Sequence, residues 1–165
     1  MTPRAGPVGR TSTMADDSFR IAELLLQGFK CSHILMQLAL EAQGRASPEL
    51  VRAMSGLAVG MSQGFNCGAL TGGCCVLGLY AGRGAEDEAE DPRLDVLVDE
   101  FSWWFRNHAR EQFGGIDCAE IMRFDPALRQ QRCPGLILRS WEKLVETLEQ
   151  HGIDIAVPPQ PAEPA

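Results

Sequence analysis

The apolar run at residues 68–82 is the feature of this sequence that most constrains its fold. The run reads Gly-Ala-Leu-Thr-Gly-Gly-Cys-Cys-Val-Leu-Gly-Leu-Tyr-Ala-Gly and carries no charged residue. A helix that is apolar all round is buried on every side, and this run falls short of the ~18 continuous apolar residues of a membrane span. We therefore expect a central helix inside a globular domain, with no membrane insertion.

Apolar residues recur at helical spacing along the rest of the chain as well. Ser47-Pro48-Glu49 predicts a helix start, because it combines a capping side chain, a proline at the first helical position and an acid in the first turn. No segment alternates at the period of two that a half-buried strand requires. Helices are predicted over 18–26, 32–42, 47–64, from Asp91 toward Gly114, near 118–122 and over 134–150. The predicted fold class is all-α, a single-domain helical bundle around a buried, glycine-rich central helix.

A length of 165 residues suits one domain with short tails. We expect the helical domain to span residues 15–155, between a disordered N-terminal extension (1–14) and a Pro-rich disordered tail (156–165). A domain of this size buries a sufficient core without disulfides. The six cysteines are therefore not needed as staples.

The net charge of −7 argues against nucleic acid as a partner, because phosphate contacts require clustered Lys and Arg. The first thirteen residues lack the apolar stretch of a signal peptide, so the expected compartment is the cytoplasm. Thiols stay reduced there, and a set of cysteines is more often metal-binding or catalytic than structural.

The six cysteines divide into two groups by their local context. Cys74 and Cys75 lie inside the apolar run, where free cysteine commonly serves as a small buried apolar residue. Each of the others follows a turn signal and precedes a helical run, and these are Cys31, Cys67, Cys118 and Cys133. All four are expected at helix starts, where unpaired N–H groups and a partial positive charge stabilise a thiolate. His33, two residues after Cys31, could tune or replace a ligand, although a capping role is the more ordinary explanation.

Four glycines inside the predicted central helix need a reason, because each costs roughly 1 kcal/mol relative to alanine. They are Gly68, Gly72, Gly73 and Gly78. Close packing between helices is one explanation, and a bulky object beside Cys67 is another. The two explanations are compatible.

The hexapeptide Cys67-Gly68-Ala69-Leu70-Thr71-Gly72 resembles the CGAxxG signature of the C_GCAxxG_C_C family of redox-active proteins. That family carries one characteristic cysteine upstream of the signature, one within it and two downstream. The four cysteines at predicted helix starts fall in the same order and at similar spacing. The resemblance covers residues 18–150.

The resemblance implies an iron–sulfur site, because a similar domain in the split-Soret cytochromes is associated with an iron–sulfur centre. The implied ligands of a [2Fe–2S] cluster are Cys31, Cys67, Cys118 and Cys133. The chain lacks Cys-x-x-Cys-His, so no covalent haem is expected.

Three functions therefore remain open. The leading one is cluster-based electron transfer or redox sensing, in which four thiolates hold a [2Fe–2S] cluster. A metal-free thiol–disulfide protein comes second, because Cys-x-x-Cys is absent, and a four-thiolate zinc site comes third, because zinc ligands usually come in close pairs. We expect an electron carrier or redox-accessory protein rather than a stand-alone enzyme, and its partner would be a redox protein that the sequence does not identify. The Trp103-Trp104 pair would permit a homodimer.

Overall fold

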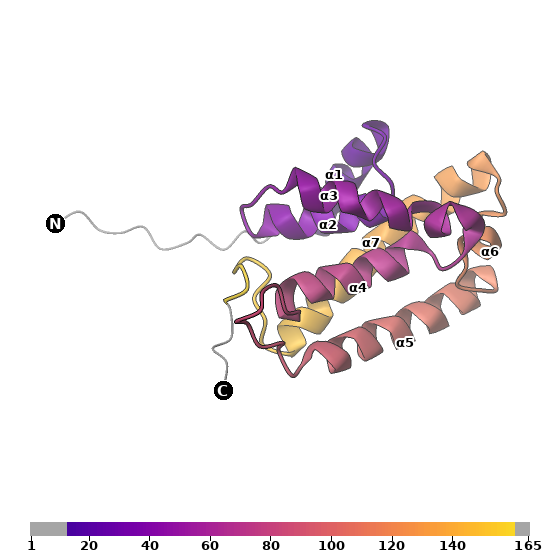
Figure 1. Ribbon diagram of the computed structural model, residues 1–165. Helices are drawn as coiled ribbons and strands as arrows, with labels where there is room; N and C mark the ends of the chain where they lie inside the picture. The colour runs from indigo at the N-terminus through magenta and orange to yellow at the C-terminus, as the bar shows by residue number, and fades with distance from the viewer. Residues whose placement is uncertain (1–12, 161–165) are drawn as a thin grey trace.

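The computed structural model describes residues 13–160, which form a bundle of seven α-helices (Figure 1). Residues 13–160 contain no β-strand, and an isolated antiparallel bridge joins Asn66 and Asp117. The all-α prediction is confirmed, while the expected tails fall largely outside the described residues. The helices are α1 (Met14–Leu26), α2 (Cys31–Ala42), α3 (Pro48–Ala53), α4 (Gly68–Ala81), α5 (Leu94–Phe113), α6 (Cys118–Met122) and α7 (Pro126–Gln150).

Helix α4 is the central helix that its composition predicts. It packs against α2, α5 and α7, and its side chains Val76 and Leu77 are fully buried. The expectation of burial on every side is wrong for one stripe, because the three neighbours cover only part of the circumference. The half-exposed stripe consists of Thr71, Cys74, Cys75, Gly78 and Leu79.

Two of the α4 glycines are explained by the close approach of neighbouring helices. A Cβ added to Gly72 would lie 2.8 Å from the Cα of Ser32 on α2, and one added to Gly73 would lie 2.4 Å from the ring of Phe101 on α5. Ser32 is itself completely buried, and its hydroxyl donates a hydrogen bond to the Met54 carbonyl at 2.8 Å. Nothing in the structure explains Gly78, where an added Cβ would have no neighbour within 4 Å.

The predicted continuous helix over 47–64 is wrong. The Ser47 side chain does cap α3, but the helix ends at Ala53 and continues as a 3₁₀ turn, Met54–Leu57, and an irregular turn, Gly60–Gly64. Val59 and Met61 adopt the left-handed conformation in this segment, and Gly60 and Gly64 do so without a Cβ penalty. The chain reverses here and delivers Cys67 to the start of α4.

The predicted start of the last helix at residue 134 is also wrong. Helix α7 begins at Pro126, and the Asp125 side chain accepts a hydrogen bond from the N–H of Ala127 at its first turn. Asp125-Pro126 therefore supplies the cap and first-turn proline that the prediction assigned to Cys133-Pro134. Pro134 lies inside the helix, where it has no N–H to donate to the carbonyl of Gln130.

The described chain contains no helix that is both long enough and apolar enough to cross a bilayer.

Candidate functional site

Four cysteines, at or within four different helices, line one small cavity. The cavity has a volume of about 30 Å³, which is room for roughly one or two water molecules. Its walls are mostly apolar, and Lys30 and Arg129 are the cations among its lining residues. The structure thus brings together Cys31, Cys67, Cys118 and Cys133.

Three of the four cysteines stand at a helix start. Cys31 is the first residue of α2, Cys67 is the N-cap of α4, and Cys118 is the first residue of α6. The backbone fixes two of them together. The Cys67 N–H donates to the Ile116 carbonyl at 3.1 Å, and the Cys118 N–H donates to the Phe65 carbonyl at 2.8 Å.

Cys133 does not stand at a helix start, contrary to the sequence prediction. It lies within α7, seven residues after Pro126 (133 − 126 = 7), so it gains nothing from a helix N-terminus. Burial raises the pKa of the Cys133 thiol to about 11, and the nearby sulfurs of Cys31 and Cys118 act in the same direction. Cys133 is therefore a protonated thiol at neutral pH.

Cys31 is the one thiol of the four with a lowered pKa. The Cys67 thiol donates a hydrogen bond to the Cys31 sulfur and is the main cause that lowers the pKa of Cys31 to about 7, against the effect of burial. The N–H groups of Ser32 and Val59 and the charge of Arg129 act in the same direction. The same hydrogen bond and burial raise the pKa of Cys67 well above its usual value. Cys31 is thus the thiol of the pair that ionises first, and Cys67 remains protonated as its hydrogen-bond donor.

The glycine of the CGAxxG signature that follows Cys67 makes room for this pair. A Cβ on Gly68 would lie 2.6 Å from the Cys31 sulfur and 3.1 Å from the Leu57 carbonyl. Close packing therefore explains Gly72 and Gly73, which admit neighbouring helices, and Gly68, which admits the sulfur of Cys31. A bulky occupant beside Cys67 stays a prediction.

Strained backbone surrounds the cavity. Val59 lines the cavity and has a φ of 56°, although its branched side chain disfavours the left-handed region. Arg123 and Phe124, directly after α6, both have a φ of 52°. Such conformations cost about 1–3 kcal/mol each and cluster at functional sites. One strained turn precedes Cys67 in the chain, and the other follows the helix that Cys118 begins.

The donor set fits a four-thiolate cluster. A [2Fe–2S] cluster is held by four Cys thiolates, two on each iron. Within residues 13–160, no group of three or more His, Cys, Asp or Glu side chains is arranged to hold a metal ion. The cavity is small, so an occupant larger than water would have to widen it.

His33 and the cysteine pair of α4 are directed away from this cavity. His33 caps α2, because its Nδ1 accepts from the Lys30 N–H at 3.1 Å and its Nε2 lies 2.8 Å from the Ser55 hydroxyl. The Cys74 sulfur lies 3.6 Å from the Ser102 hydroxyl, and neither Cys74 nor Cys75 lines the cavity. The capping explanation of His33 is confirmed.

Sequence reasoning missed Arg129 and Val59. Arg129 lies four residues before Cys133, which is one helical turn, but that relation is visible only when the helix is known to begin at Pro126. Val59 carries no sequence signal, because its role rests on its backbone N–H and not on its side chain.

Alkylation of Cys31 in the metal-free protein should follow a pH midpoint near 7, because the thiolate is the reactive form. Replacing Cys67 by alanine removes the S–H donor, so the midpoint should rise toward the ordinary thiol value of ~8.5. The rate of carboxamidomethylation at Cys31, followed by peptide mass spectrometry across pH, measures the shift. Cys75→Ala is the matched control, and an unchanged midpoint in Cys67→Ala would show that Cys67 does not set the pKa.

The comparison with protein families agrees with this arrangement of cysteines. A family model described as "Putative redox-active protein (C_GCAxxG_C_C)" matches residues 29–147, a span that includes all four cysteines of the cavity. Neither a curated protein nor a solved structure matches the chain. The family match covers well over half of the sequence, and the chain therefore belongs to the C_GCAxxG_C_C family.

Proposed function

We propose that this protein binds a [2Fe–2S] cluster through Cys31, Cys67, Cys118 and Cys133 and uses it for electron transfer or redox sensing. The observation that carries the proposal is that thiols from four separate helices line one buried cavity. Unrelated core cysteines have no reason to converge, and four thiolates are the standard ligand complement of such a cluster. When bound, the cluster supplies one-electron redox chemistry.

The protein's own residues prepare the site in three ways. The N–H groups of Ser32 and Val59 point to the Cys31 sulfur, and hydrogen bonds of this kind tune a cluster's potential. Arg129 supplies a positive charge that offsets part of the charge of four thiolates. Apolar neighbours such as Ile121 and Ile137 line the cavity and limit the access of water.

The three thiols with raised pKa values make loading dependent on pH. Burial raises the pKa of Cys118 and Cys133, and the bond to Cys31 raises that of Cys67, so all three are protonated at neutral pH. Thiolate ligands must lose their protons, and binding therefore releases them. Loading should become more favourable as the pH rises from 7.

Anaerobic reconstitution with ferrous iron and sulfide tests the proposal. We expect a coloured protein with about two irons and two sulfides per chain and, after reduction, the electron paramagnetic resonance signal of a [2Fe–2S] centre. Zinc content is measured in the same sample. A colourless, iron-free product after reconstitution would refute cluster binding.

A second function is favoured by the placing of Cys31 and Cys67 in one small cavity, where a hydrogen bond from the Cys67 thiol lowers the pKa of Cys31. In a thiol–disulfide protein, the Cys31 thiolate would attack a sulfur of a disulfide substrate and release one substrate thiolate. Cys67, after losing its proton, would then attack the mixed disulfide, leaving a Cys31–Cys67 disulfide and a fully reduced substrate. Peptide mapping of the oxidised, metal-free protein would reveal that disulfide.

The partner also belongs to the proposal. An electron carrier or sensor requires a redox partner protein. Phe65, two residues before Cys67, and Phe124, whose ring lies near Gly64, are 56% and 64% exposed and offer an apolar surface for it. A homodimer remains a prediction. Of the two tryptophans, Trp103 is 61% exposed and open to a partner, whereas Trp104 packs against Phe101 and His108 within the chain.

A further inference from the structure

A second and much larger hollow lies between α1 and α7 and shares Leu25, Arg129 and Cys133 with the small cavity. This groove has a volume of about 660 Å³, within the range of small-molecule sites. Its lining is mainly apolar, including Ile21, Leu25 and Leu26 of α1 and Leu138 of α7. Leu26 is 90% exposed at the groove, an unusual position for a large apolar side chain.

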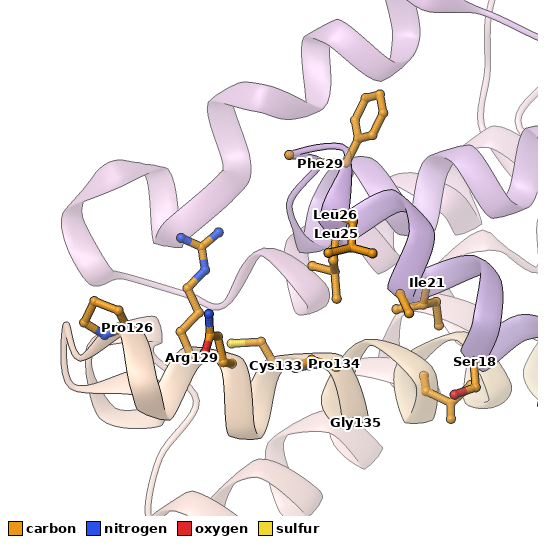
Figure 2. A pocket seen from close by; sticks show the side chains of 14 residues that line it. Ser18, Ile21, Leu25, Leu26, Phe29, Pro126, Arg129, Cys133, Pro134 and Gly135 are labelled. Carbon is orange, nitrogen blue, oxygen red and sulfur yellow. The ribbon is translucent and has the colours of Figure 1, made fainter.

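Few polar groups converge on this apolar groove. Figure 2 shows Arg129 and Cys133 extending from α7 on the side that faces Leu25 and Leu26. Arg129 is half-buried, and within residues 13–160 its guanidinium forms no ion pair with a carboxylate, although its charge acts on the nearby cysteine sulfurs. Gln130 also lines the groove. Its backbone carbonyl receives no helical hydrogen bond from residue 134, because Pro134 has no N–H.

Helix α7 contains two residues of low helix propensity where it lines this groove. Pro134 and Gly135 are the two residue types least suited to a helix interior, and both line the groove. Packing does not require the glycine, because an added Cβ would meet nothing within 4 Å and its φ is not positive. The absence of a side chain at Gly135 instead leaves the groove open. Breaches of local preference without a packing reason are typical of functional sites.

We propose that the groove binds a small organic anion, with its apolar body between α1 and α7 and its carboxylate or similar group at Arg129. Charge complementarity selects this occupant, since Arg129 is the one cation that lines the groove. Arg129, Cys133 and Leu25 also line the four-cysteine cavity, so the bound molecule would lie next to Cys133. The inference goes beyond the redox function, and it is tested on the metal-free protein because Arg129 also lies beside the four cysteines.

Calorimetric titration with decanoate, decanol and decyltrimethylammonium, below their micelle concentrations, tests the proposal on the full chain. Decanoate should bind one molecule per chain, decanol more weakly and the cation most weakly. Arg129→Gln should weaken decanoate about tenfold, because a charge-assisted contact is lost, and should leave decanol unchanged. Gly135→Leu should remove binding of both, because the new side chain occupies the groove.

Two matched variants separate occupancy from damage to the fold. Gly78→Leu adds the same side chain at another helical glycine with open space, away from the groove. Arg139→Gln removes an equivalent charge from an exposed position on α7. Both should bind decanoate as the unaltered protein does, and thermal unfolding of all four variants checks that they fold.

Three results would overturn the proposal. One is equal binding of decanoate and decyltrimethylammonium, which would show that Arg129 does not select the charge. Another is unaltered decanoate binding in Gly135→Leu. The third is sedimentation of the protein as a dimer that Gly135→Leu dissociates, without decanoate binding, which would assign the groove to a second copy of the chain. The titration uses the metal-free protein, so its failure is distinct from failure of reconstitution.

Discussion

Serine at any one of Cys31, Cys67, Cys118 or Cys133 should abolish the visible absorption of the reconstituted protein, whereas serine at Cys74 or Cys75 should leave it intact. The reason is geometric, since the first four line one cavity and the α4 pair does not. A cluster that needs four thiolates loses a ligand in each of the first four variants. Iron per chain, measured after anaerobic reconstitution, should fall from about two to near zero in each.

Cys118→Ser and Cys133→Ser carry the most information in this series. A thiol–disulfide protein that uses Cys31 and Cys67 would keep its activity in both, because neither residue belongs to that pair. A cluster protein would lose its cofactor in both. Cys74→Ser is the matched control, as a half-buried cysteine on the same bundle. Equal loss of iron at all six positions would mean that the division into four ligands and two others is wrong.

The fold could be predicted from the sequence where apolar spacing and capping residues agree. The composition of 68–82 predicts α4 as the central helix, and the periodicity of 32–42 predicts α2. Ser47 caps α3 as expected, through a hydrogen bond from the Leu50 N–H to its hydroxyl at 3.4 Å. These signals are local, because they depend on side chains within one or two turns of the helix that they predict.

The course of the chain from Ala53 to Cys67 could not be predicted in this way. Helical spacing continues through Leu57, Ala58 and Met61, but the α-helix ends before them. The chain reverses direction here, and backbone hydrogen bonds then pair the segment of Cys67 with that of Cys118. Tertiary contacts impose positive φ angles on Val59, Met61 and Ser62, which no residue preference at these positions would suggest. Long-range constraint overrides propensity here.

The four cysteines of the site could be selected from the sequence, but for a reason that is only partly right. Their common position at helix starts holds for Cys31, Cys67 and Cys118 and fails for Cys133, which reaches the cavity from within α7. The order and spacing of cysteines in the family that the sequence resembles select Cys133 independently of that argument. The division of charge between Cys31 and Cys67 could not be predicted, because it requires the two sulfurs to be neighbours in space.

Gly72→Ala should lower the free energy of unfolding by about 3 kcal/mol, because the added methyl group overpacks the interface between α2 and α4. Its Cβ would lie 2.8 Å from the Ser32 Cα and 3.0 Å from the Ser32 Cβ, so the backbone of α2 itself must move. Such movement strains the bond from the Ser32 hydroxyl to the Met54 carbonyl and displaces the adjoining Cys31. Denaturant titration followed by circular dichroism measures the loss.

Gly78→Ala is the matched control for this prediction, because it is the same substitution on the same helix without a steric conflict. An added Cβ there meets nothing within 4 Å, so the gain in helix propensity should raise the free energy of unfolding by about 1 kcal/mol. The opposite signs of the two variants distinguish close packing from a general intolerance of α4 to alanine. Equal effects of Gly72→Ala and Gly78→Ala would contradict the role of Gly72 in the approach of α2. Because Ser32 directly follows Cys31, Gly72→Ala should also weaken cluster loading, linking the second glycine of the CGAxxG signature to the site through α2.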